Sequence, residues 1–327
     1  MVNIRKNYKR KRERKVGELL ACIALVLFSG NIILTKIAAS RLNLDLGFLI
    51  SVIVNVLFSA FLFFIQVIFF EINLDWNTKG VVLFLLAGLF STYLGRWFFF
   101  ETIDKLGPAR ASAFQVSNPL FTTIIAWVFI GEKFNFKDFI SIIIILLGLF
   151  LVSYVPRDFI KNETAASKEF LEVQSARTNP IKWIVQSGVL LAFFSSFSYA
   201  VGNVVRGAAI QSWNQPILGG MLGALLGFVL HAFTNKNTHE FWKLIRKANS
   251  QGVALYTISG IITISAQILV IASMRYIPVS IANLITLSTP ILVTPLSFFL
   301  FKNQERITFK TIIGIILALG GISSIIL

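Results

Sequence analysis

Long apolar segments recur along the chain, separated by shorter polar stretches. Each segment holds roughly 20 predominantly apolar residues, enough for a helix to cross the hydrocarbon core of a membrane. Runs such as residues 140–152 lack the period-two alternation expected of barrel strands. Because a helix satisfies its backbone hydrogen bonds internally, the pattern predicts an all-α integral membrane protein. We predict ten transmembrane helices, at residues 17–35, 46–70, 80–100, 109–130, 138–155, 183–205, 216–233, 252–273, 279–301 and 311–327.

The same order of marker residues occurs twice along the chain. The markers of the first half are Pro108, Asn118-Pro119 and Glu132-Lys133. About 170 residues later, the second half repeats them as Pro278, Thr289-Pro290 and Glu305-Arg306. Each half contains five predicted helices, an odd number, so the second copy enters the membrane upside down. Two inverted five-helix repeats are a common plan for transporters, with the binding cavity at their interface.

The predicted organisation has four parts. Residues 1–16 form a basic tail, 17–155 the first five-helix repeat, 156–182 a polar linker and 183–327 the second repeat. Within the second repeat, the 234–250 segment has apolar residues on one helical stripe and basic residues off it. This pattern predicts an amphipathic helix at the membrane interface, and a partner-docking helix is the alternative.

Charge on the chain is scarce and unevenly distributed. Only 14% of residues are charged and 56% are hydrophobic, whereas about a quarter of the residues in a soluble domain carry charge. The net charge is +15, and eight Lys/Arg lie within the first fifteen residues. We interpret this tail as a cytoplasmic anchor that contacts anionic lipid, in preference to a nucleic-acid-binding arm or a sorting signal.

The basic tail also sets the expected orientation. We take the first apolar segment as a retained helix and place both termini in the cytoplasm, since ten spans is an even number. The Lys/Arg distribution in the other loops does not favour this orientation. The expected location is the bacterial cytoplasmic membrane, and a homodimer is left open.

Polar side chains recur at matched positions in the fourth and ninth predicted helices. Ser112, Gln115 and Asn118 precede Pro119, and Asn283, Thr286 and Thr289 precede Pro290 at the same steps. Polar groups inside a span usually face a cavity or a neighbouring helix. The stripes therefore line a substrate cavity or form hydrogen bonds between helices.

The first and sixth predicted helices carry a further set of candidates. The first contains Asn31, with Lys36 at its end, and the sixth contains Tyr199 and Asn203, with Arg206 at its end. The two cations coincide at the repeat offset. They either snorkel to the interface or contact an anionic or zwitterionic substrate.

Arg96 is the most unusual residue of the apolar segments. It follows sixteen uncharged residues, and a charge at mid-membrane costs about 2.5–3.5 kcal/mol on insertion scales. Three interpretations remain open: Arg96 snorkels outward, pairs with an acid from another helix, or faces the transport pathway.

Signals for enzyme chemistry are weak. His231 and His239 are the only histidines, and the single cysteine, Cys22, excludes an internal disulfide. No Cys/His/Asp cluster has metal-ligand spacing, and no Walker-type phosphate loop is present. We therefore expect neither a catalytic site nor a cofactor.

Several short motifs together resemble a known family. Gly95-Arg96, the 107–111 segment, Pro119 and Gly131-Glu132-Lys133 are similar to the EamA-like branch of the drug/metabolite transporter superfamily, and the second half repeats the frame. The resemblance covers nearly the whole chain after the tail. It implies ten helices in two inverted repeats, a central cavity, and movement of small metabolites. The interval from Pro290 to Glu305 is two residues longer than its counterpart.

The leading hypothesis is a secondary transporter of a small organic solute. Cations in the spans, where acidic partners are almost absent, favour anionic or zwitterionic solutes such as amino acids. The alternative is a membrane scaffold or assembly subunit, in which the polar stripes only hold helices together. The residues expected to bind substrate are Asn31, Arg96, Ser112, Gln115, Asn118, Tyr199, Asn203, Arg206, Asn283 and Thr286.

Overall fold

A computed structural model describes residues 2–70, 75–106, 114–133, 135–152, 188–234, 241–300 and 309–326. The described residues form helices and short connections, with no strand among them, which confirms the all-α prediction. Ser112 and the predicted linker, residues 156–182, lie outside the described residues.

In the described residues of the first half there are eight helical segments. They are α1 (Val2–Ala39), α2 (Leu44–Phe69), α3 (Thr78–Ala87), the π-helix η1 (Gly88–Gly95), α4 (Arg96–Leu106), α6 (Ser117–Ile125), the π-helix η2 (Ala126–Ile130) and α7 (Phe136–Val152). The second half contains α11 (Val189–Ser212), α12 (Pro216–Thr234), α13 (Phe241–Lys247), α14 (Ser250–Ser273), α15 (Val279–Thr286), α16 (Thr289–Leu300) and α17 (Phe309–Ile326).

Seven helices in the described part of the chain are long and apolar enough to cross a membrane. They cover Lys11–Ala39, Leu46–Phe69, Thr78–Phe99, Val189–Ser212, Pro216–Thr234, Ser250–Ser273 and Val279–Ser297. Large apolar side chains such as Phe61, Phe64 and Phe233 are exposed on their outer faces. Since lipid is the solvent that such faces suit, the chain is an integral multi-pass membrane protein.

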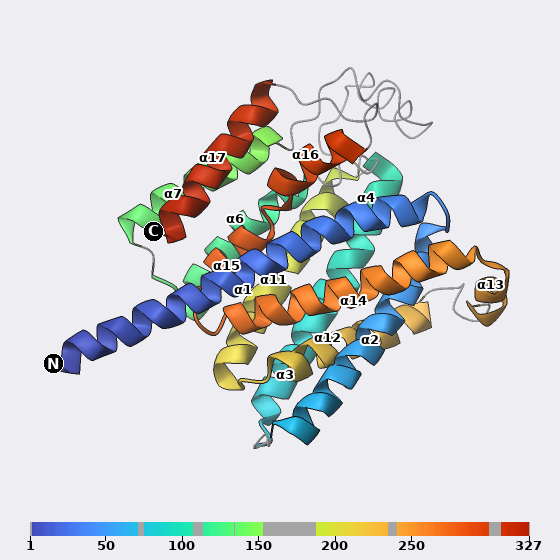
Figure 1. Ribbon diagram of the computed structural model, residues 1–327, viewed down its shortest axis with the longest axis horizontal. Helices are drawn as coiled ribbons and strands as arrows, with labels where there is room; N and C mark the ends of the chain where they lie inside the picture. Colours follow the sequence, from blue (N-terminus) through green and yellow to red (C-terminus); the bar gives the residue numbers. More distant parts are fainter. Residues whose placement is uncertain are drawn as a thin grey trace.

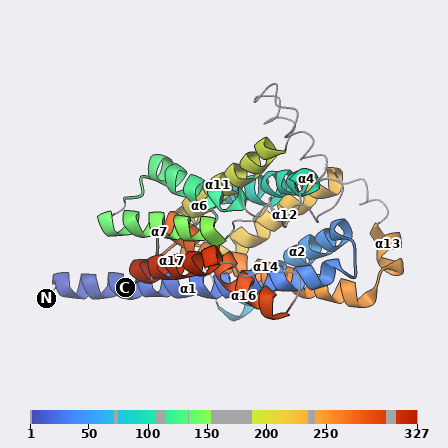
Figure 2. The ribbon, with the colours of Figure 1, turned by 90° about the horizontal axis from the view of Figure 1, so that it is seen from above.

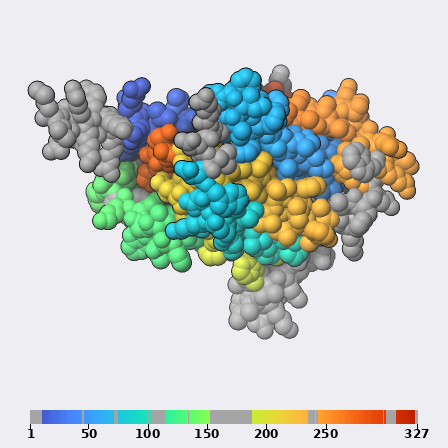
Figure 3. All heavy atoms as spheres, turned by 90° about the horizontal axis from the view of Figure 1, so that it is seen from below, coloured from blue at the N-terminus to red at the C-terminus, as the bar shows by residue number. Residues whose placement is uncertain are grey.

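The two halves of the chain are interleaved. α1 of the first half runs along α14 of the second, and α7 runs along α17 (Figure 1). The α7–α17 pair lies towards the end of the long axis at which α1 begins, and α13 lies at the other end (Figure 2). In Figure 3 the green residues of α7 and most of the orange residues of the second half lie on opposite sides. Gly17 of α1 lies against Tyr276 and Ile277, whereas Gly252 of α14 lies against Leu42. α1 and α14 are therefore antiparallel, and we call the end that carries Gly17 and Tyr276 the tail side.

Glycine allows η1 to approach α11 and α12 closely. A Cβ on Gly88 would lie 2.7 Å from the Cα atom of Gly223, and a Cβ on Gly202 would lie 2.7 Å from the Cβ atom of Ser91. Such small-residue contacts are typical of helix packing in membranes, where no hydrophobic effect drives association. They fix the position of Ser91 relative to α11.

α15 is the most enclosed element. All eight of its residues are buried, and it contacts α1, α6, α11 and α14. Helices of both halves thus surround α15, which makes it the centre of the bundle.

Several predicted helices differ from the structure. The fourth, predicted as one helix over 109–130, is interrupted by a turn at Val116. α1 extends beyond residues 17–35 at both ends, and the third span changes from α-helix to π-helix at Gly88. The sixth helix, predicted at 183–205, is observed at Val189–Ser212. The ninth, predicted as one helix over 279–301, is interrupted at Leu287-Ser288. Hydropathy locates apolar segments well, but backbone breaks and buried charges depend on tertiary contacts.

The predicted amphipathic segment forms α13. Its apolar residues pack on a buried cluster that includes Leu46, Ile50 and Tyr256 of α2 and α14, with Phe241 and Leu244 among the contacting residues. The apolar stripe of α13 therefore faces other helices of the chain.

Candidate functional site

Polar side chains from three helices form hydrogen bonds in the centre of the bundle. Asn203 of α11 donates its side-chain amide to Asn283 Oδ1 of α15 at 2.7 Å. Asn283 in turn donates to Asn118 Oδ1 of α6 at 2.9 Å and to Thr122 Oγ1 at 2.8 Å. All four residues are buried. Because α6 belongs to the first half and α11 and α15 to the second, these bonds join the two repeats.

Arg206 extends this arrangement towards η1. One terminal guanidinium nitrogen donates to Asn203 Oδ1 at 3.1 Å, and the other donates to Ser91 Oγ at 2.8 Å. Arg206 is only 6% exposed. We call these six residues the central polar network: Ser91, Asn118, Thr122, Asn203, Arg206 and Asn283.

The burial of Arg206 argues against the first of its two interpretations, snorkelling to the interface. α11 continues to Ser212, so Arg206 lies inside the helix and does not snorkel to an interface. In the described residues, no carboxylate forms an ion pair with it. A guanidinium has five N–H donors, and a buried cation without a counter-ion is costly unless a ligand supplies one.

The central polar network lies next to two helix breaks at equivalent repeat positions. In the first repeat the break is a turn at Val116, three residues before Pro119. In the second it is Leu287-Ser288, where Leu287 lies three residues before Pro290. A proline in the first turn of a helix leaves no amide hydrogen unpaired, so a helix can begin again at such a residue after a break. Interrupted helices near the membrane midplane are typical of substrate sites in transporters.

A second polar cluster lies beside the first. Gln115 donates its amide to Ser195 Oγ at 2.9 Å, and Ser195 donates to the carbonyl of Gly95 at 2.8 Å. Gly95 precedes Arg96, whose guanidinium lies 4.4 Å from the ring centroid of Phe48. The Arg96 guanidinium also interacts with the hydroxyl of Tyr199.

The surroundings of Arg96 bear on whether it pairs with an acid of another helix. Its side chain is half-buried, and no described acid pairs with it. It is held over an aromatic face, a cation–π contact that compensates part of the cost of leaving water. Arg96 therefore lies among α2, α11 and η1.

The remaining candidates do not join these clusters. Thr286 is buried, but its hydroxyl donates to the carbonyls of Ala282 and Asn283 in its own helix. Asn31 of α1 has a buried side-chain carbonyl oxygen that finds no hydrogen-bond partner in the described residues. Lys36 lies in the last turn of α1, which agrees with its predicted position at the end of the first helix.

Sequence reasoning missed three residues of these clusters, Thr122, Ser91 and Phe48, and the contacts of Glu132. Thr122 lies one turn after Asn118, and this spacing could have indicated it. Ser91 and Phe48 gave no signal, because their roles depend on residues far away in the chain. Glu132 was recognised as part of a repeated motif, but its partners on α15 were not.

Glu132 receives hydrogen bonds at the start of α15. Its carboxylate accepts bonds from the amides of Val279 and Ser280 and from the Ser280 hydroxyl. A carboxylate at this place accepts hydrogen bonds from amide groups that a helix start leaves unpaired. Its negative charge is also stabilised by the positive end of the helix dipole. The first repeat thus caps the central helix of the second.

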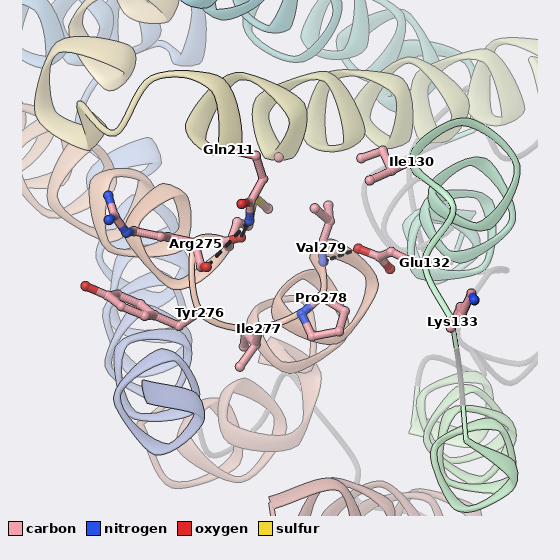
Figure 4. Close-up of a pocket in the computed structure, with 11 residues that line it drawn as sticks. Ile130, Glu132, Lys133, Gln211, Arg275, Tyr276, Ile277, Pro278 and Val279 are labelled. Carbon is pink, nitrogen blue, oxygen red and sulfur yellow. Dashed lines mark hydrogen bonds between the residues drawn. The ribbon is translucent and has the colours of Figure 1, made fainter. Parts of the chain in front are cut away.

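A cavity of about 270 Å³ lies beside this cap at the tail side (Figure 4). Its walls come from the end of η2 and the loop after it, from α11, and from residues 274–279. Figure 4 shows Val279 between Glu132 and Gln211, with Glu132 directed towards the start of α15.

His231 is held by structural contacts. Its Nε2 lies 3.1 Å from the backbone carbonyl of Thr92, and its ring lies edge-on to Phe48 and Tyr93 at centroid distances of 4.9 and 5.1 Å. No group of three or more potential metal ligands is found in the described residues.

Comparisons with known proteins agree with this architecture. The model of the EamA-like transporter family matches the chain twice, over residues 15–154 and 186–327. A solved structure titled only "Crystal structure of protein" has a TM-score of 0.64 at 15% sequence identity, covering 94% of this chain and 96% of that one. That similarity shows the fold alone. No curated protein matches the sequence.

Proposed function

The chain belongs to the EamA-like transporter family, within the drug/metabolite transporter superfamily, and from this premise we propose that it moves a small organic solute across the membrane by alternating access. Ten helices in two inverted repeats would rock about a shared central site. The observation that carries the proposal is the central polar network, which joins both repeats beside two equivalent helix breaks.

We assign the substrate to anionic or zwitterionic metabolites, with amino acids as the leading candidates. Arg206 is buried without a described counter-ion, and Arg96 is half-buried without one. A substrate carboxylate would supply the missing charge, so its binding would offset the cost of burying a cation. A lipophilic cation would instead be repelled.

The proposed roles follow from position. Arg206 would bind the substrate carboxylate, and the amides of Asn118, Asn203 and Asn283 would exchange their mutual bonds for bonds to the solute. Such an exchange costs little because hydrogen bonds replace hydrogen bonds. The other residues proposed to contact the solute are Asn31, Arg96, Ser112, Gln115, Tyr199 and Thr286.

A membrane scaffold is the second candidate function. The amides of Asn118 and Asn283 already bond to each other, as they would if their only task were to hold α6 against α15. Solute flux distinguishes a scaffold from a transporter.

The test of function is flux into proteoliposomes that contain the purified protein. We expect uptake of at least one anionic or zwitterionic metabolite from a mixed panel, and a raised melting temperature with the same compound, because a ligand of the folded state stabilises it. Asn118→Ala, Asn283→Ala, Gln115→Ala and Thr286→Ala should each reduce this uptake by roughly tenfold, about one hydrogen bond to a charged group.

The melting temperature of each alanine variant provides the control. If activity, yield and melting temperature fall together, the polar residues hold helices together and the scaffold is favoured. Absence of flux for every compound on the panel would reject the transporter proposal.

Both termini are proposed to lie in the cytoplasm, with the basic start of α1 against anionic lipid. The tail side should then be cytoplasmic. Asp75 belongs to that side, because the adjacent Trp76 ring contacts Trp213 at the end of α11. Ser250 belongs to the opposite side, near Leu42.

Single-cysteine labelling in a Cys22→Ser background tests this orientation. An impermeant maleimide should label Asp75→Cys only from the cytoplasmic side and Ser250→Cys only from the other side, since both positions are exposed. The reverse pattern would show that the basic tail does not set the topology.

A further inference from the structure

The contact between Glu132 and α15 depends on a sharp turn. Gly131 follows η2 with φ 72°, a left-handed conformation that glycine adopts at little cost. The turn directs Glu132 towards the second repeat, where its carboxylate accepts bonds from Val279 and Ser280. These bonds are charge-assisted, and such bonds are stronger than neutral ones.

Val279 packs against Gly207 between the tail-side cavity and the residues of the central polar network. It is 3% exposed, and a Cβ on Gly207 would lie 2.0 Å from its Cγ2 atom. Both residues line the cavity. On the inner side, Gly207 adjoins Arg206 in α11, and Asn283 lies one turn after Val279 in α15. The Val279–Gly207 contact is therefore one helical turn from the network.

A second tie holds the segment before α15. Gln211 of α11 donates its side-chain amide to the carbonyl of Met274 at 2.9 Å. This bond fixes the 274–278 segment to α11, whereas Glu132 fixes the start of α15 to the first repeat. Among the described residues, the hydrogen bonds of Glu132 tie the start of α15 to the first repeat, so displacement of the start of α15 from η2 must break them.

We propose that Glu132 is a latch that holds the tail-side gate shut, and that the gate is the contact of Val279 with Gly207. Opening the gate would connect the tail-side cavity with the central polar network. The inference rests on the proposed transport function and names the device that regulates access to the same site. Glu132 acts through α15, so it is a positioning residue.

The experiment measures gate opening without transport. Val279→Cys in a Cys22→Ser background is treated from the tail side with an impermeant maleimide, with and without Glu132→Gln. Glutamine keeps the length of the side chain but loses its charge, and one of its two acceptor oxygens becomes a donor. We expect labelling to accelerate about tenfold, as for the loss of one charge-assisted hydrogen bond.

Two controls separate a latch from general stabilisation. Lys137→Gln removes the charge of an exposed residue at the start of α7, outside the cavity lining, and should leave the labelling rate unchanged. Ala21→Cys reports on another fully buried position towards the tail side of α1, and should stay slow when Glu132→Gln is added.

Equal labelling of Val279→Cys with and without Glu132→Gln would overturn the latch, as would equal acceleration at Ala21→Cys. Because labelling needs no solute, these outcomes are independent of flux. Flux without accelerated labelling rejects the latch alone, and accelerated labelling without flux rejects transport alone.

Discussion

Arg206→Gln is expected to lower the specific rate of solute uptake by roughly one to two orders of magnitude. Hydrogen bonds to charged groups contribute about 1.5–3 kcal/mol, and Arg206 is the only cation of the central polar network. Glutamine can still reach a hydrogen-bond partner but offers no charge to a substrate carboxylate. The loss should appear for anionic and zwitterionic solutes.

Folding should survive this substitution. Replacing a buried charge by a neutral group removes a desolvation cost, which compensates for the lost bonds to Ser91 and Asn203. We therefore expect the melting temperature without solute to change little, while stabilisation by solute disappears. Uptake and thermal stability are measured on the same preparations.

Arg96→Gln is the matched comparison. Arg96 is half-buried and held over Phe48 at 4.4 Å, so its charge is more hydrated than that of Arg206. The same replacement should weaken uptake less and leave protein abundance unchanged. If Arg206→Gln transported as well as the wild type, the substrate carboxylate would not bind there, and the assignment of substrate charge would fail.

Apolar segment length and the repeat of polar markers predicted much of this fold. The segments indicate membrane helices because lipid demands internal hydrogen bonding, and the repeat led to the family, which the family model confirms. The fourth and ninth helices were also correctly singled out as carriers of polar side chains. Asn118 and Asn283 lie on them and bond to each other.

The sequence could not show how far Arg206 lies from the end of its helix. Hydropathy treats a cation as the limit of an apolar segment, but α11 continues because Ser91 and Asn203 accept the guanidinium bonds. Ser91 lies 115 residues away in the chain. The π-helix that carries Ser91 is equally invisible to periodicity, since it depends on how α11 and α12 pack against it.

Glu132 illustrates the same limit. Its place in the repeated motif was visible, yet its partners lie 147 and 148 residues away. A cap supplied by another segment leaves no local signature, unlike a capping residue that precedes its own helix. Contacts of this kind become evident only when both elements are placed in space.

Because η1 and α12 are in backbone contact, a side chain added at Gly88 is expected to lower the stability of the folded protein strongly. A Cβ on Gly88 would lie 2.6 Å from the carbonyl oxygen of Gly223 and 2.7 Å from its Cα atom. Because both are backbone atoms, they cannot rotate away, so the two helices would have to separate. We expect Gly88→Ala to destabilise the protein by about 1–3 kcal/mol, seen as a lower melting temperature and lower yield in detergent.

Gly320→Ala is the matched control for this substitution. Gly320 also lies within a helix, α17, but nothing stands within 4 Å of the position its Cβ would take. There the change should be neutral or slightly stabilising, since alanine favours helix more than glycine by about 1 kcal/mol. Equal melting temperatures for the two variants would show that η1 and α12 are not in backbone contact.

The consequence of Gly88→Ala should extend to the central polar network. Ser91 lies one turn after Gly88 on η1 and accepts the bond from Arg206. If α12 displaces η1, this bond lengthens, and the buried guanidinium loses a partner it needs. We therefore expect the Gly88→Ala protein that still folds to lose uptake as well as stability, whereas Gly320→Ala retains both.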